Sequence, residues 1–257
     1  MRALLFLLLF LGACGSADAR REQPRSQCRQ QRFEGSSFTV CDPKGGRLQL
    51  FAATRLEKPI RSFAELQTRL DPSRVAFAMN AGMFDGNGRP IGMAVAGRKQ
   101  IRKVNLKDGA GNFHLTPNGV FMVTCGGQAA IFRSDAIPLF RCAPQLSTQS
   151  GPMLVIDGKL HPKLEPDGPS RYVRNGVGVK DGKALFVISQ DPVSLGKFAR
   201  FFRDGLKTPD ALYFDGSVSS LWDPANGRQD SHSELGPIIV AFKPAASTPD
   251  REGPARP

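Results

Sequence analysis

Short apolar or β-branched runs alternate with turn-forming residues along most of the chain, and this pattern predicts a protein built mainly of strands. Glycine, proline and Asp-Gly pairs separate many of the runs. Asp157-Gly158 and Asp181-Gly182 lie between neighbouring runs and predict hairpin turns. The predicted strands are residues 38–41, 48–54, 75–79, 92–96, 119–124, 129–132, 153–156, 176–180, 184–189, 211–214 and 238–242.

Helical spacing occurs in two segments. Ser62 and Glu65 form a capping box ahead of apolar residues on one face. A second helix is predicted to begin at Asp191-Pro192, and its apolar stripe indicates packing against a sheet: Leu195, Phe198, Phe201, Phe202 and Leu206. Strands with few helices predict an α+β fold, a single domain with a large mixed β-sheet flanked by a few helices.

The first thirteen residues predict a signal peptide. Arg2 is its positive end, and the apolar residues 3–11 are too few to span a bilayer. Residues 11–14, Leu-Gly-Ala-Cys, are typical of a bacterial lipobox, so we expect Cys14 to be acylated and to hold the protein at a membrane surface. The alternative is ordinary secretion, in which Cys14 is removed. Either route takes the mature chain out of the cytosol, to the periplasmic face of a membrane or beyond.

Composition sets the limits of the folded part. Residues 14–27 are polar and basic without apolar periodicity, which is typical of a flexible linker. Residues 243–257 are rich in proline, alanine and charge and are typical of a disordered tail. We therefore expect one domain over residues 28–242, which is long enough to bury a sizeable core.

The cysteines fit an exported protein. Without Cys14, four of the five cysteines remain, an even number in an oxidising compartment. Three pairings of Cys28, Cys41, Cys125 and Cys142 are open, and we expect the local one, Cys28–Cys41 with Cys125–Cys142, because both loops are short. Metal binding is the competing use of cysteine. The chain has no C-x-x-C pair and its three histidines are scattered, so no metal site is predicted.

The net charge of +12 raises the question of nucleic-acid binding. The basic residues are spread along the chain, and the aromatic residues do not alternate with them as in nucleic-acid-binding modules. We therefore expect no nucleic-acid partner. A basic surface that faces anionic polymers of the cell envelope is the better interpretation.

Polar side chains follow two buried runs directly. Asn80 and Gly82 follow residues 75–79, and Asp215, Gly216 and Ser217 follow residues 211–214. A strand that ends in this way delivers polar groups to a sheet edge, where glycine leaves room for a ligand. Asp215 is therefore the best catalytic candidate, and the alternative is a simple Asp-Gly turn.

Two arginines three residues apart, Arg171 and Arg174, suit a phosphate, because guanidinium groups bind its oxygens in bidentate fashion. On an extended strand they would point to opposite faces, so they can share a ligand only if the segment turns or bulges. The alternative is a pair of surface arginines in ordinary ion pairs. Similarly, Asn80 either binds a ligand oxygen or closes an Asx-turn. Ser150 lacks the G-x-S-x-G pattern of a serine nucleophile.

Taken in order, these motifs resemble the phosphodiester glycosidase family, and in particular its small bacterial branch. The family's Asn-Gly-Gly-Phe-Phe appears as residues 80–84, Asn-Ala-Gly-Met-Phe, and its Asp-Gly-Gly-Gly-Ser as residues 215–219, Asp-Gly-Ser-Val-Ser. The matching stretches are NAGMFDGNGRPIGMAV from Asn80, GNFHLTPNGVF from Gly111, TQSGPMLVIDGKLHP from Thr148, SRYVRNGVGV from Ser170 and ALYFDGSVSSLW from Ala211.

The resemblance implies a hydrolase that cleaves the glycosidic C–O bond of a sugar-1-phosphodiester and releases free sugar and a phosphomonoester. Arg171 and Arg174 would neutralise the phosphate, and Asp215 would stabilise the oxocarbenium-like centre or activate water. The substrate would be a small-molecule or envelope glycan phosphodiester, and no cofactor is implied. The expected substrate-binding residues are Asn80, Gly82, Gln149, Ser150, Asn175, Gly216 and Ser217.

Two alternatives stay open. The first is a non-catalytic envelope lipoprotein that binds an anionic glycan in the same pocket. The second is a metal-dependent phosphodiesterase that cleaves the P–O bond, which predicts dependence on a chelatable metal.

Overall fold

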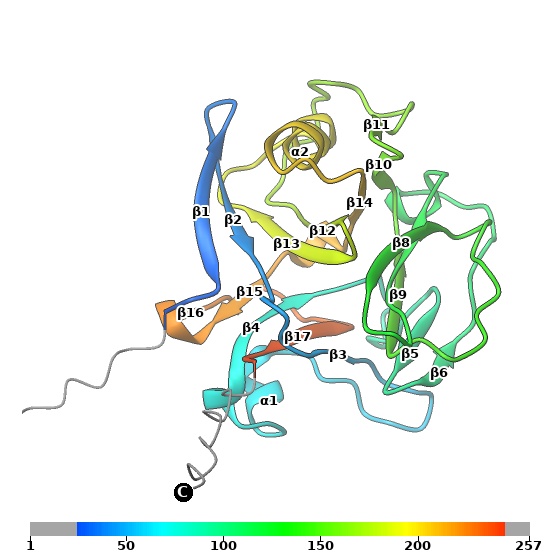
Figure 1. Ribbon diagram of the computed structural model, residues 1–257, viewed down its shortest axis with the longest axis vertical. Coiled ribbons are helices and arrows are strands. Elements are labelled where there is room, and N and C mark those ends of the chain that lie inside the picture. The colour runs from blue at the N-terminus through cyan, green and yellow to red at the C-terminus, as the bar shows by residue number, and fades with distance from the viewer. Residues whose placement is uncertain (1–24, 245–257) are drawn as a thin grey trace, which may run out of the picture.

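The protein folds into three antiparallel sheets and a few short helices, as the computed structural model shows for residues 25–244 (Figure 1). The predicted α+β class and the single domain are confirmed. The strands do not form one large mixed sheet, however, because every pairing between the strands of residues 25–244 is antiparallel. Several sequence neighbours are joined by tight hairpins, which permit antiparallel pairing only.

The first sheet has seven strands and contains both predicted hairpin turns. Asp157 and Gly158, and likewise Asp181 and Gly182, have positive φ, as the two-residue hairpin turn requires. In spatial order the strands are β1 (Cys28–Phe33), β2 (Ser36–Cys41), β13 (Lys183–Ser189), β12 (Asn175–Lys180), β14 (Asp210–Tyr213), β10 (Met153–Ile156) and β11 (Lys159–Leu160).

The other two sheets have five strands each. The second sheet is β16 (Arg228–Gln229), β15 (Leu221–Asp223), β4 (Val75–Asn80), β17 (Ile238–Phe242) and β3 (Leu48–Phe51). The third is β6 (Lys99–Arg102), β5 (Ala94–Ala96), β9 (Leu146–Ser150), β7 (Gly119–Val123) and β8 (Ala129–Arg133). Every predicted strand is present, with ends that shift by a few residues. Six further strands are not predicted by the sequence pattern: β1, β6, β9, β11, β15 and β16.

Both predicted helices form. In α1 (Phe63–Gln67), the Ser62 hydroxyl accepts a hydrogen bond from the backbone of Glu65 at 3.1 Å. The second helix, α2 (Leu195–Arg200), begins after Ser194 rather than at Asp191-Pro192. Val193 explains the difference, because its backbone exchanges hydrogen bonds with Tyr172 and stays extended. A π-helical turn (Phe201–Gly205) continues α2, and 3-10 turns occur at Pro72–Arg74, Asn112–His114, Gly216–Val218 and Pro224–Asn226.

Phenylalanine fills much of the core between α2 and the first sheet. Phe198, Phe201 and Phe202 are fully buried, so the stripe on this helix serves packing, as predicted. The rings of Phe38 and Phe201 stack with centroids 4.0 Å apart. Tyr213 belongs to the same cluster, which places the end of β14 directly under the helix.

All four cysteines of the described chain are oxidised in the expected local pairing, Cys28–Cys41 and Cys125–Cys142. Cys28 and Cys41 lie directly opposite each other, so the first bond joins the start of the edge strand β1 to the end of β2. Cys14, the predicted signal peptide, most of the predicted linker and nearly all of the predicted tail lie outside the described residues.

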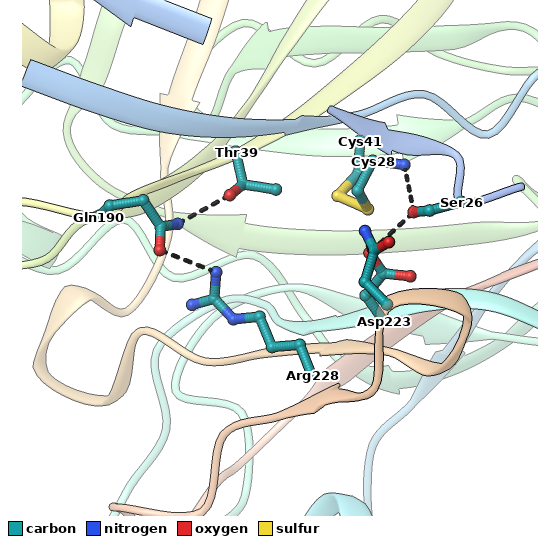
Figure 2. Close-up of a disulfide and its surroundings, with 8 residues drawn as sticks. Ser26, Cys28, Thr39, Cys41, Gln190, Asp223 and Arg228 are labelled. Carbon is teal, nitrogen blue, oxygen red and sulfur yellow. Dashed lines mark hydrogen bonds between the residues drawn. A yellow bond between two sulfur atoms is a disulfide. The ribbon is translucent and has the colours of Figure 1, made fainter. Parts of the chain in front are cut away.

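A polar network links the first sheet to the second beside the Cys28–Cys41 bond (Figure 2). Ser26 donates from its hydroxyl to the buried carboxylate of Asp223 at 2.8 Å. Gln190 donates to the Thr39 hydroxyl at 2.8 Å and accepts from the Arg228 guanidinium at 3.2 Å. The start of the folded domain is therefore bound to two sheets at once.

Within residues 25–244, no three His, Cys, Asp or Glu side chains converge so as to hold a metal ion. A helix long and apolar enough to cross a bilayer is likewise not found in that range.

Candidate active site

Asp215 lies where the first sheet meets the end of β4. It follows Tyr213 and Phe214, which are buried at the end of β14, and is itself partly exposed. Its carboxylate accepts a hydrogen bond from the Ser217 backbone at 3.1 Å and so caps the 3-10 turn Gly216–Val218. Its backbone N–H donates to Ala81 at 3.1 Å. The two strand ends singled out in the sequence are therefore side by side.

The electrostatic environment of Asp215 is dominated by burial. Burial raises the pKa of this carboxyl group above its ordinary value, and the hydrogen bonds from Ser217 lower it in part. Within residues 25–244 no Lys, Arg or His forms an ion pair with Asp215. A carboxyl group whose pKa is raised by burial is a candidate for catalysis, and structural carboxyl groups show the same shift.

Asn80 and Asn175 hold the Asp215 segment in place. Asn175 donates from its amide to both oxygens of Asn80 at 2.9 Å, and Asn80 donates to the backbone oxygen of Asp215 at 2.8 Å. The Ser220 backbone and the Ser219 hydroxyl complete the network, donating to Asn80 and Asn175 respectively. Both asparagines are fully buried. Their amides fix the position of Asp215 through its backbone.

Arg174 is one of the largest fully buried side chains in the structure. Its guanidinium donates to the backbone oxygen of Val193 at 2.7 Å, to the Tyr213 hydroxyl at 2.8 Å and to the backbone oxygen of Ser170 at 2.8 Å. These acceptors are all neutral. An arginine that is buried without a carboxylate partner carries a high desolvation cost.

Arg171 occupies a different environment from Arg174. It is exposed, and no hydrogen bond or ion pair of its side chain is found among the described residues. Between the two arginines, Tyr172 forms an antiparallel bridge with Val193, and the Arg174 side chain reaches back to the backbone and hydroxyl of Ser170. One guanidinium is thus accessible and the other is fixed beneath the surface.

The remaining predicted site residues surround the end of β9. Gly82 donates to the Thr148 hydroxyl at 3.1 Å, and a Cβ on Gly82 would overlap the backbone oxygen of Gln149. The Gln149 side chain accepts from the backbones of Met93 and Asn105 at 2.9 and 2.8 Å, so it fixes these two loop segments. The hydroxyl of Ser150 is buried and has no partner within residues 25–244.

Sequence reasoning missed Tyr213. Its hydroxyl lies between Arg174 and the Asp215 turn, and a Cβ on Gly216 would collide with it. A signal was available in the sequence, because Tyr213 is only two residues before the catalytic candidate Asp215.

A separate cavity of about 440 Å³ lies between the residues after β2 and the β12–β13 turn. Its lining includes Lys44, Arg47 and Lys183 and none of the predicted site residues.

The sequence profile of the phosphodiester glycosidase family matches residues 73–235, well over half of the chain. The chain belongs to this family. The match includes Asn80, Arg171, Arg174 and Asp215, so the whole site lies within the phosphodiester glycosidase region.

Among curated proteins, the chain is 37% identical over 150 residues to YigE, an uncharacterized protein of Escherichia coli K12. This match covers 58% of the chain and 58% of YigE, so it spans less than two thirds of its relative.

Solved structures share the fold. The catalytic domain of zebrafish N-acetylglucosamine-1-phosphodiester alpha-N-acetylglucosaminidase superposes with a TM-score of 0.59 at 14% identity, over 85% of this chain and 82% of that one. A putative exported protein of Burkholderia pseudomallei gives 0.51 at 11% identity, over 81% and 73%. At these identities the likeness concerns the fold alone.

Proposed function

We propose that this phosphodiester glycosidase family member is an exported hydrolase that cleaves the anomeric C–O bond of a sugar-1-phosphodiester. The observation that carries the proposal is the juxtaposition at the end of β14. There a partly exposed carboxyl group with a raised pKa, Asp215, follows Tyr213 by two residues, and the Tyr213 hydroxyl accepts a hydrogen bond from the buried Arg174, whose acceptors are all neutral. A carboxylate and a cation are the two charges that this reaction requires.

The reaction separates charge in a defined way. As the C–O bond breaks, its electron pair goes to the phosphate oxygen. Positive charge then develops on the sugar ring. The carboxylate of Asp215 stabilises the ring or removes a proton from the attacking water. A phosphomonoester leaves more readily than an alkoxide, so strong protonation of the leaving group is not required.

The two arginines take different parts in this proposal. Arg171 is exposed and binds the phosphate oxygens directly. Arg174 supplies positive charge from below the surface, where the low dielectric strengthens its effect.

The other site residues hold the strand ends around Asp215 in place. Asn80, Asn175 and Gln149 are buried and hydrogen-bonded, so they fix the backbone of the site rather than change partners on binding. Gly82 and Gly216 keep the strand ends free of side chains, and the exposed Ser217 and the buried hydroxyl of Ser150 are the remaining candidates for contacts with the substrate.

The two disulfides are typical of a protein outside the cytosol. With the predicted lipobox at Cys14, we propose a lipoprotein of the cell envelope that acts on a small-molecule or glycan phosphodiester at a membrane surface.

Incubation of the protein with a panel of sugar-1-phosphodiesters in H₂¹⁸O tests the proposal. Cleavage of the C–O bond places ¹⁸O in the released sugar, whereas ¹⁸O in the phosphomonoester would overturn the assignment and favour the P–O mechanism. Asp215→Asn should lower turnover by about a hundredfold or more. Asp181→Asn is the matched control, because it makes the same change in the Asp-Gly turn beyond the opposite end of β12 from Asn175.

The non-catalytic alternative predicts another result. If the protein binds the panel compounds without releasing products, and Asp215→Asn leaves binding unchanged, the glycan-binding lipoprotein replaces the hydrolase.

A further inference from the structure

Tyr213 is held in one orientation by its surroundings. It is 2% exposed, and its ring packs against Phe198 in the cluster beneath α2. Its hydroxyl accepts a hydrogen bond from Arg174 at 2.8 Å. On the other side the backbone of Gly216 approaches so closely that no side chain would fit there. The phenol oxygen is therefore fixed at the base of the Asp215 turn.

The hydroxyl proton of Tyr213 is a hydrogen-bond donor without an acceptor among residues 25–244. A phenol oxygen carries one proton, and the bond from Arg174 occupies an acceptor position of that oxygen. For the proton of Tyr213 itself, no acceptor is found within residues 25–244. The Tyr213 hydroxyl is thus a donor at the site with no partner among the described residues.

The neighbouring charge makes this donor stronger. Arg174 has only neutral acceptors, so its positive charge is not cancelled by a carboxylate and polarises the phenol it contacts. The charged or titratable groups around Tyr213 are Arg174, Asp215 and Tyr172, and burial has the largest effect, raising the pKa of the phenol. Tyr213 therefore keeps its proton at neutral pH.

We propose that the Tyr213 hydroxyl donates a hydrogen bond to a phosphate oxygen of the substrate, and that Arg174 acts on the leaving group through it. This inference rests on the proposed function and adds a residue to it. Tyr213 would be a catalytic residue, and Arg174 a positioning residue that orients and polarises the phenol.

In this scheme water attacks the anomeric carbon and the C–O electron pair passes to the phosphate oxygen. One proton of the water stays on the sugar as its new hydroxyl, and the other passes to Asp215 and then to the solvent or the phosphomonoester. Tyr213 keeps its proton throughout, and its hydrogen bond shortens as negative charge grows on the leaving oxygen.

Tyr213→Phe removes only the hydroxyl and should lower kcat by about a hundredfold, with a smaller effect on KM. The chain has two tyrosines, so Tyr172→Phe is a matched control. Tyr172 is 61% exposed, and we expect this variant to keep wild-type kcat. Circular dichroism and Tm report whether each variant folds. A folded Tyr213→Phe protein with the kcat of the control would overturn the inference.

A second experiment leaves the fold intact. In the Tyr172→Phe background, biosynthetic incorporation of 3,5-difluorotyrosine changes Tyr213 alone and makes its phenol more acidic. The alkaline limb of the kcat profile should then move to lower pH, whereas an unmoved limb would contradict a role for the phenol proton. Failure of the proposed function is a distinct result, because the Tyr172→Phe protein would then turn over none of the sugar phosphodiesters.

Discussion

Arg171 and Arg174 are the same residue type three positions apart, and the structure gives them different environments. Arg174 directs its guanidinium nitrogens at three separate acceptors, whereas Arg171 is exposed to solvent. A lysine in place of Arg174 has one nitrogen and cannot reach all three acceptors. Substitution with lysine therefore has different consequences at the two positions.

We expect Arg174→Lys to lower both stability and turnover, because a buried polar group left without its partner costs about 1–3 kcal/mol. Arg171→Lys should leave stability unchanged and weaken turnover mainly through KM, since it loses the bidentate contact with phosphate. Urea denaturation and steady-state kinetics of both variants check this. Equal losses of stability would show that Arg171 is also part of the folded framework.

Asp215 predicts an unusual pH dependence of stability. Because burial raises its pKa in the folded protein, the folded state binds the proton more tightly than the unfolded state does. The free energy of unfolding should then fall as the pH rises from the unfolded pKa through the folded pKa. Asp215→Asn removes this loss, so it should raise Tm at neutral pH and have little effect in acid. A lower Tm at neutral pH would contradict the raised pKa.

The raised pKa of Asp215 also predicts how activity depends on pH. If catalysis requires the ionised carboxylate, the acid limb of the kcat/KM profile should lie above the pKa of an ordinary aspartate. An acid limb at or below the pKa of an ordinary aspartate would show that the catalytic group does not have a pKa raised by burial.

At the residue scale, the buried run before Asp215 made this residue the catalytic candidate, and the family that its motif resembles is confirmed by the profile match over residues 73–235. It could not show that Asn80 and Asn175 bond to each other, because 95 residues separate them. It also could not show that the Gln149 side chain accepts hydrogen bonds from two loop segments, because the residues next to a glutamine in the sequence do not reveal its distant partners.

At the element scale, turn chemistry and apolar runs predicted strands reliably wherever both were present. The missed strand β9 reads Leu-Ser-Thr-Gln-Ser, and its polar residues are buried between two neighbouring strands. β1 was missed for a related reason, since its polar side chains face solvent at a sheet edge. Both segments form strands because they pair with other strands. Such pairing depends on residues far away in the sequence and not on local propensity.

The turn after β14 offers an element-scale prediction. Gly216→Ala places a methyl group on the Tyr213 hydroxyl, so it should displace the turn, lower turnover and destabilise the protein by about 1–3 kcal/mol. Gly86→Ala is the control, because open space surrounds Gly86 and its φ is ordinary. Kinetics and thermal unfolding of both variants provide the measurement, and matching behaviour of the two would show that the Gly216 contact is not restrictive.

The edge strand β1 depends on its disulfide. Replacing Cys28 and Cys41 together with alanine opens a short loop, a change worth roughly 3 kcal/mol in the chain-entropy model. We expect the free energy of unfolding to fall by that order and hydrogen exchange in β1 to accelerate more than in β14. Uniform acceleration across the sheet would instead mean that β1 unfolds only with the whole domain.

At the scale of the whole molecule, the sequence predicted the α+β class and a single domain but not the division into three sheets. The residues that join sheets, such as Thr39, Gln190 and Arg228, lie far apart in the chain and carry no local signal. A pattern of alternating residues identifies a strand without identifying the sheet to which it belongs.

The predicted lipobox determines where we expect the protein to be located. If Cys14 is acylated, Cys14→Ser should move the protein from the membrane fraction to the soluble envelope fraction, because the lipid chains supply the membrane affinity. Fractionation followed by immunoblotting measures this, with Cys125→Ser together with Cys142→Ser as the control for loss of cysteines alone. An unchanged distribution would indicate an ordinary secretory leader.

The bond between Cys28 and Cys41 also determines how the protein would respond to mechanical load. A pull on the N-terminal side of Cys28 passes through the two sulfur atoms to the end of β2, because these residues face each other across the hairpin. The residues between them stay unstretched for as long as the bond is intact. In single-molecule extension, the oxidised domain should therefore lengthen by less than its residue count allows, and reduction should restore the missing length.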